Sequence, residues 1–117
     1  MRPATRLLSL LLLTTLCGCA AIDRLTGEGE ARRIRQVGTT ADAVVLSISD
    51  TGMTLNDDPI VAFRLRVRPP SGAPYEAETR ARVGRLDVPQ VQPGAVLPVA
   101  IDPRDPNKVA LRLYRDR

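Results

Sequence analysis

Residues 60–68 read IVAFRLRVR, and large apolar side chains alternate with small or basic ones along this stretch. Its odd-numbered positions are Val, Phe, Leu and Val, whereas the even-numbered positions from 64 onward are all Arg. A period of two predicts a β-strand with one buried and one solvent-exposed face. Residues 75–83 alternate in the same way, after a break at 69–74 that is rich in proline. The two stretches therefore predict a β-hairpin.

The charges of this hairpin also predict its register. If the numbers of opposed residues sum to 144, Arg68 lies opposite Glu76 and Arg66 lies opposite Glu78. Opposite charges then pair across the two strands, which stabilises the hairpin. A slip of one residue would turn every side chain to the wrong face, so the alternation excludes that neighbouring register.

Three further segments have strand character. Residues 40–49 are rich in β-branched side chains, and residues 96–101 and 109–113 form short apolar or alternating runs. The sequence DTG at 50–52 predicts a turn after the first of these strands. Pro98 lacks the amide donor that a central strand needs, so residues 96–101 are expected to form an edge strand or a bulge.

These segments predict the fold class and the organisation of the chain. Five strands without a long helix favour an all-β fold over residues 38–113, a small five-stranded antiparallel barrel that is closed or nearly closed. By fold-level analogy, its general shape resembles that of OB-like barrels. Residues 19–37 are polar and mixed in charge, and we expect a tether followed by a short helix there. Residues 114–117 are expected to be a tail.

The first 18 residues have the layout of a secretory signal peptide. Arg2 and Arg6 supply a positive start, and residues 7–16 form an apolar run. This run is too short to span a bilayer comfortably, which takes about 20 apolar residues. Cleavage removes both arginines, so the formal net charge falls from +4 to +2.

The leader ends in Leu16-Cys17-Gly18-Cys19, and this motif resembles the lipobox of bacterial lipoproteins. The resemblance implies that Cys19 is the lipid attachment site. Its sulfur would take a diacylglycerol, the chain would be cut before it, and its freed amine would receive a fatty acid such as palmitate. The protein would then be held at the cell envelope by its N-terminal lipid. Ala20 after the cysteine favours the periplasmic face of the outer membrane, if the organism is diderm.

Two alternatives stay open for the leader. An ordinary signal peptide would be cut near Ala20 or Ala21 and would release the domain. An uncleaved anchor would extend the apolar run to Ile22 and would hold the domain on the membrane without a lipid.

The composition argues against catalysis. The chain has no His and no Trp, one Phe and two Tyr. Without His there is no imidazole to act as a general base or to activate a nucleophile. The scarcity of aromatic side chains also disfavours a base-stacking surface for nucleic acid. We therefore expect a protein that is not an enzyme and has no cofactor, metal or nucleic-acid partner.

The stretch from Ala43 to Leu111 resembles a group of small, uncharacterised bacterial β domains. The features that carry this resemblance are turn and core residues: Ala43, Val45-Leu46, Gly52, Asn56, Pro59, Val67, Tyr75, Pro93-Gly94, Asp102-Pro103 and Val109. The resemblance implies a fold and supplies no function.

Tyr75, Arg64, Arg66 and Arg68 are the candidate ligand-binding residues. The arginines form a basic stripe that could meet an anionic group, although a solvated sheet face neutralised by glutamates is the structural alternative. For Tyr75 the alternative is packing in the core. The oxygen-bearing side chains of Asp50, Asn56, Asp57 and Asp58 could hold calcium, but the same residue types are also those of tight turns.

We expect a membrane-anchored lipoprotein with a non-catalytic interaction or structural role, and an envelope protein is its candidate partner. The alternative is a module that binds an oligosaccharide or an anionic polymer.

Overall fold

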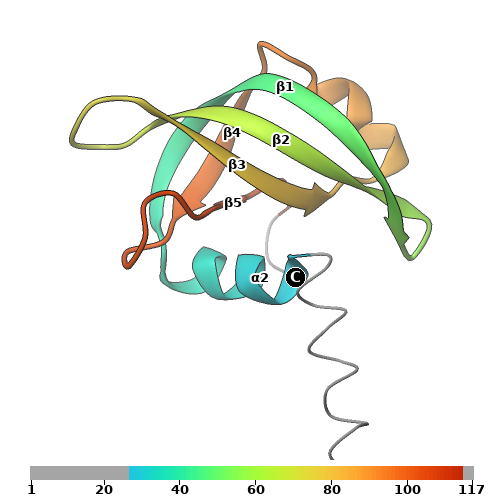
Figure 1. Cartoon of the computed structure of the whole chain (residues 1–117), viewed down its shortest axis with the longest axis horizontal. Coiled ribbons are helices and arrows are strands. Elements are labelled where there is room, and N and C mark those ends of the chain that lie inside the picture. Colours follow the sequence, from blue (N-terminus) through green and yellow to red (C-terminus); the bar gives the residue numbers. More distant parts are fainter. Residues whose placement is uncertain (1–26, 115–117) are drawn as a thin grey trace, which may run out of the picture.

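A computed structural model describes residues 27–114, which form a five-stranded antiparallel sheet with one α-helix and one short 3₁₀ helix (Figure 1). The elements are α2 (Glu28–Val37), β1 (Thr39–Leu55), β2 (Asp58–Arg68), β3 (Tyr75–Arg82), η1 (Arg85–Val91), β4 (Val96–Ile101) and β5 (Val109–Leu111). The predicted leader at 1–18, Cys19 and residues 115–117 of the predicted tail lie outside the described residues. The expected fold class is confirmed in its coarse form, a mostly-β domain of five antiparallel strands with one short helix.

The sheet is open rather than closed into a barrel. Its strand order is β3-β2-β1-β4-β5, so β3 and β5 are the two edges. The edges approach each other, and the Thr79 hydroxyl of β3 donates a hydrogen bond of 2.8 Å to the carbonyl of Val109 in β5. A closed barrel would need a ladder of backbone hydrogen bonds between β3 and β5, but β5 is only three residues long. The closed OB-like barrel predicted from the sequence is therefore corrected to a curled open sheet.

The hairpin of β2 and β3 is confirmed, but its predicted register is wrong by two residues. The numbers of paired residues sum to 142, so Arg66 lies opposite Glu76 and Arg64 lies opposite Glu78. The predicted register would have paired Tyr75 with Pro69, which has no amide hydrogen for a ladder. Because the shift is even, the apolar and charged faces stay as predicted.

The turn expected at 50–52 is instead a bulge inside one long strand, because β1 continues to Leu55. Gly52 has φ 76°, and its amide donates to the Asp50 carboxylate at 2.8 Å. The chain reverses only at Asn56 and Asp57, whose φ angles of 51° and 67° are typical of a two-residue hairpin turn.

Pro98 lies in a strand that has neighbours on both sides, so the expectation of an edge strand is wrong. Its carbonyl accepts a hydrogen bond of 2.9 Å from the amide of Arg112. The amide and carbonyl of one residue in an antiparallel strand point to the same side. The side of Pro98 that lacks an amide hydrogen is therefore the side that faces β5. At this position the ladder between β4 and β5 has already ended, because its last pair is Val99 with Leu111.

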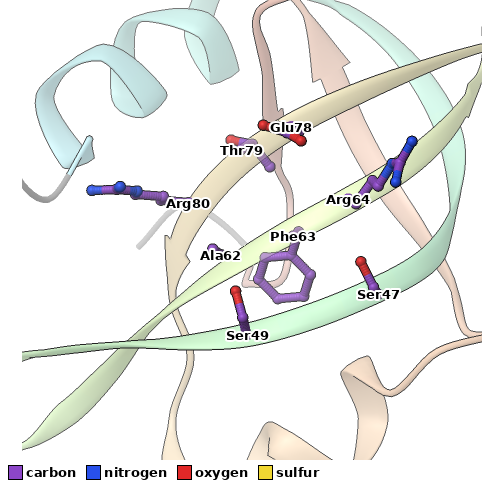
Figure 2. A pocket seen from close by; sticks show the side chains of 8 residues that line it. All are labelled: Ser47, Ser49, Ala62, Phe63, Arg64, Glu78, Thr79 and Arg80. Carbon is purple, nitrogen blue, oxygen red and sulfur yellow. The ribbon is translucent and has the colours of Figure 1, made fainter.

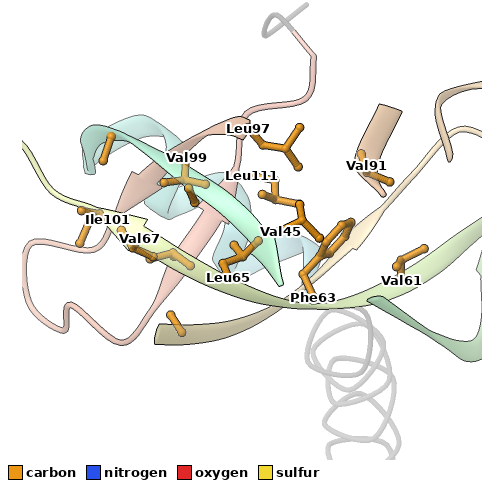
Figure 3. Close-up of a cluster of buried hydrophobic side chains, with 14 of the residues drawn as sticks. Val45, Val61, Phe63, Leu65, Val67, Val91, Leu97, Val99, Ile101 and Leu111 are labelled. Atoms are coloured by element: carbon orange, nitrogen blue, oxygen red, sulfur yellow. The ribbon is translucent and has the colours of Figure 1, made fainter. Parts of the chain in front are cut away.

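The core fills the inner face of the curled sheet (Figure 3). Its largest fully buried members include Phe63, Leu65 and Val67 of β2, which are odd-numbered positions of the alternating segment 60–68. Val91 brings η1 into the same core. Burial of each such side chain contributes about 1.5–3 kcal/mol, so this face supplies most of the stability.

Candidate functional site

The outer face of the sheet is covered over β4 and β5. Ile34 of α2 is only 3% exposed and packs against Ala100 and Ala110, whose small side chains let the helix approach closely. The helix ends at Gly38, where an added Cβ would lie 2.5 Å from the carbonyl oxygen of Ile34 and 2.8 Å from that of Ile101. A glycine is therefore needed where the chain passes from α2 into β1.

A buried carboxylate fixes α2 to the loop between β4 and β5. Asp102 is 2% exposed and accepts hydrogen bonds from the Arg33 guanidinium at 2.7 Å and from the Arg104 amide at 3.0 Å. The hydrogen bond from Arg33 is the main reason that the pKa of Asp102 is lowered. Lys108 adds an ion pair of 2.9 Å with Glu30 on the helix surface. These contacts keep α2 in one position on the sheet.

The outer face over β1, β2 and β3 carries a different set of side chains. β1 has a bulge between Val45 and Ser47, which shifts its outward positions from even to odd numbers. Ser47 therefore lies opposite Arg64, and Ser49 lies opposite Ala62. Without this bulge the two serines would point into the core.

These strands form a shallow hollow, which we call the outer groove (Figure 2). Its volume is about 440 Å³, and its lining residues are Ser47, Ser49, Ala62, Phe63, Arg64, Glu78, Thr79 and Arg80. The register places Ala62 between Ser49 and Arg80, and Arg64 between Ser47 and Glu78. Ala62 is the smallest side chain of this array, and the hollow lies over it.

A second hollow, which we call the helix groove, lies between α2, β3 and the chain around Lys108. Its volume is about 260 Å³, and its lining residues are Gly27, Glu30, Ala31, Ile34, Glu78, Thr79, Arg80, Asn107, Lys108 and Val109. Both grooves use the segment 78–80 of β3. The two hollows therefore adjoin each other across that strand.

The structure does not gather the four predicted ligand-binding residues at one place. Arg64 lines the outer groove, and one of its guanidinium nitrogens lies 2.8 Å from the Glu76 carboxylate. Arg66 and Arg68 lie on the same outer face but line neither of the two grooves.

Tyr75 alternates onto the inner side of β3 and packs against the main core. Its hydroxyl donates a hydrogen bond of 2.6 Å to the carbonyl of Pro106. Burial raises the pKa of this hydroxyl. The side chain thus joins β3 to the loop before β5, on the other side of the sheet from the arginines.

Sequence reasoning missed the two serines of the outer groove. Ala43 and Val45 point inward two residues apart, whereas the next inward apolar residue, Ile48, follows after three. This change of spacing indicates a bulge between Val45 and Ile48. With the bulge taken into account, Ser47 and Ser49 are expected on the outer face. Glu78 was expected on the outer face, but nothing in the sequence grouped it with serines of another strand.

The acidic residues within 50–58 serve as turn and bulge residues. Asp50 accepts a backbone amide, and Asn56 and Asp57 form the hairpin turn. Over residues 27–114, no three carboxylate, His or Cys side chains lie close enough together to hold a metal ion.

No helix within the described part of the chain is long and apolar enough to cross a membrane. Comparison of the chain with protein-family models, curated proteins and solved structures finds no match. The chemistry of the leader and the geometry of the two grooves are therefore the observations from which a function is inferred.

Proposed function

We propose that the protein is a bacterial lipoprotein, anchored by lipid to the cell envelope, whose sheet domain is a non-catalytic interaction module. The observation that carries the proposal is the motif Leu16-Cys17-Gly18-Cys19 at the end of an apolar leader. Its resemblance to a lipobox makes Cys19 the lipid attachment site. Ala20 in the next position favours the periplasmic face of the outer membrane in a diderm organism.

The physical chemistry of lipid anchoring supports this assignment. One acyl chain binds a membrane only marginally, whereas two or three chains hold a small domain firmly, because each buried methylene contributes about 0.8 kcal/mol. Gly27, the first residue of the described domain, lies eight positions after Cys19. Such a connection spans at most about 28 Å, so the domain would work close to the membrane surface.

The residues of the grooves support binding rather than catalysis. The serine hydroxyls of the outer groove have no imidazole to activate them, because the chain contains no His. The buried carboxylate of Asp102 is already engaged by Arg33. An interaction role needs only an accessible surface, and the outer face over β1–β3 provides one.

A ligand-binding module is the second candidate, and the outer groove is the observation that favours it. Its hydroxyl, carboxylate and guanidinium groups suit an oligosaccharide or an anionic polymer. A likeness to OB-type domains belongs to this proposal as well. It is supported by the way Thr79 and Tyr75 join the sheet edge β3 to the chain around β5.

Metabolic labelling of cells with radioactive palmitate tests the anchor. We expect the Cys19→Ala variant to lose the label and to accumulate at the size of the uncut precursor. Cys17→Ala is the matched control, because it removes a thiol only two residues away and should leave labelling and processing unchanged. Retention of the label in Cys19→Ala, or its loss in Cys17→Ala, would contradict the assignment.

A further inference from the structure

We propose that the outer face of the sheet where β2, β1 and β4 lie side by side rests on an anionic phospholipid surface. We call this face the membrane patch, and its residues are Val44, Val96, Pro98, Arg66, Arg68 and Arg112. None of them lines either groove. The inference rests on the lipid anchor proposed above and specifies which side of the tethered domain meets the membrane.

The strand ladders bring the apolar members of the patch together. Val44 of β1 lies opposite Val96 of β4, and Pro98 follows two residues later on the same side of β4. Val45 and Leu97, the next residues along the two strands, belong to the core. The alternation of each strand therefore turns Val44, Val96 and Pro98 to the outer face.

The helix α2 leaves this part of the sheet uncovered. It packs on β4 at Ala100, whereas Val96, at the start of the same strand, is 55% exposed. Pro98, between these two positions, is exposed as well. Contact with the interface of a membrane removes this apolar surface from water without any rearrangement of the fold, and that burial favours the contact.

Two arginines beside the apolar residues are available to lipid phosphates. Arg66 lies opposite Val44, and Arg68 is two residues further along β2. Both side chains are exposed, and neither forms a hydrogen bond or an ion pair with any other residue of 27–114. They differ in this from Arg64 of the outer groove, whose guanidinium is bound to a carboxylate.

The neighbouring carboxylates do not cancel the charge of the patch. Asp42 lies opposite Arg68 in the ladder and offsets one positive charge. Glu76 lies opposite Arg66, but its carboxylate is 2.8 Å from the guanidinium of Arg64 and is therefore already compensated. The positive charge that remains complements the phosphate groups of anionic lipids.

Arg112 adds a further charge at the side of the patch that adjoins α2. Its amide donates to the carbonyl of Pro98, and its guanidinium donates a hydrogen bond of 2.7 Å to the carbonyl of Arg35. Both acceptors are uncharged, so these bonds fix the position of Arg112 without neutralising it. The same contact places the C-terminal end of α2 beside the patch.

The chain before the domain is long enough for the patch to reach the membrane. The ten residues of α2 make a helix about 15 Å long, which separates Gly27 from the end that contacts Arg112. Gly27 lies eight positions after Cys19, a connection of at most about 28 Å. Because the lipid and the patch belong to one molecule, a weak contact suffices to orient the domain.

Tryptophan fluorescence of the full lipidated chain in vesicles tests the inference. The chain has no Trp, so Val96→Trp carries a single reporter within the patch. The vesicles consist of phosphatidylethanolamine and phosphatidylglycerol, with and without brominated acyl chains, which quench a tryptophan that contacts the membrane. We expect the emission of Val96→Trp to shift to shorter wavelength and to be quenched by the brominated lipids. Unquenched emission from a chain that floats with the vesicles would overturn the inference.

Leu86→Trp is the matched control for exposure. Leu86 is 92% exposed, but it follows Val83, whose amide donates to the carbonyl of Pro59. Pro59 is seven positions before Arg66 on β2, which corresponds to about 23 Å along the strand. The emission of Leu86→Trp should therefore stay unquenched. Equal quenching of both variants would show that the domain meets the membrane in no fixed orientation, and the inference would fail.

Charge reversal separates the patch from the net charge of the chain. Arg66→Glu, introduced into Val96→Trp, should remove most of the quenching. Arg85→Glu makes the same change of charge at an exposed position of η1 and should leave the quenching intact. An equal loss in both variants would refute the role of the patch.

Flotation of the vesicles tells this inference apart from the anchor. The acyl chains alone are expected to make the protein float, with or without Arg66. Failure of the unaltered chain to float would contradict the lipid anchor on which the inference rests, whereas flotation without quenching overturns the membrane patch alone.

Discussion

The two halves of the outer sheet face are built from the same kind of ladder but meet different surroundings. Over β4 and β5 the outward residues are Ala100 and Ala110, and α2 covers them through Ile34. Over β1, β2 and β3 the outward residues are mostly serine, arginine and glutamate, and some of them line an open groove. One half is therefore buried beneath the helix in a small apolar cluster, and the other half is open to solvent.

The difference follows from side-chain size and charge. A helix of ten residues is about 15 Å long and can cover two or three strands at most. Alanine removes the bulk that would keep the helix away, whereas arginine on β2 would have to be desolvated beneath it. The choice of outward residues thus directs α2 to one half of the face and leaves the other half exposed to solvent.

The largest expected effect comes from breaking the covered half. Ile34→Asp places an unpaired charge against Ala100 and Ala110, and we expect it to lower the free energy of unfolding by about 3 kcal/mol. Urea denaturation followed by circular dichroism measures this loss. Val37→Asp is the matched control on the same helix, because Val37 is 57% exposed, and it should cost less than about 1 kcal/mol. Similar losses in both variants would refute the docking of α2 through Ile34.

A smaller effect is expected from the buried carboxylate that fixes α2. The pKa of Asp102 is lowered in the folded protein, so its contribution to stability is complete above the unfolded pKa of about 3.9 and is lost as the pH falls through the lower, folded value. Asp102→Asn should destabilise the domain at neutral pH and should flatten the fall in stability below about pH 4. Urea denaturation over a pH series measures both effects. A parallel pH profile in the variant would contradict this role of Asp102.

The smallest effect is expected on the open half. Arg64 and Glu76 form an exposed pair, and Arg64→Ala should change the free energy of unfolding by less than about 1 kcal/mol. The same urea titration provides the measurement. A loss as large as that of Ile34→Asp would mean that the open half, too, is part of what holds the fold together.

Alternation predicted the hairpin and its faces because it depends only on whether a residue number is odd or even. The same parity argument cannot distinguish registers that differ by two, and the predicted pairing of Arg68 with Glu76 was wrong for that reason. Proline has no amide hydrogen for a ladder, so excluding Pro69 from the pairing would have ruled out the predicted register. The lack of an amide hydrogen in Pro98 predicts an edge strand only if the neighbouring strand extends beside it. The sequence does not reveal that β5 ends at Leu111, before it reaches Pro98.

The candidate site was predictable only in part. Arg64 was identified from the basic stripe, but its partners in the groove come from β1 and β3, whose alignment depends on a bulge after Val45. Tyr75 was grouped with the arginines, although the alternation of β3 already placed it on the other face. Sites that cross several strands require the register of every strand, and composition does not supply it.

The most direct test of the account is the intact mass of the mature protein extracted from envelopes in detergent. We predict a chain that begins at Cys19 and carries a diacylglycerol and an amide-linked acyl group. Because the described domain starts eight residues later, such a chain would hold the domain close to the membrane. A mature protein that begins at Ala21 without lipid, or that retains Met1 and the leader, would contradict the account.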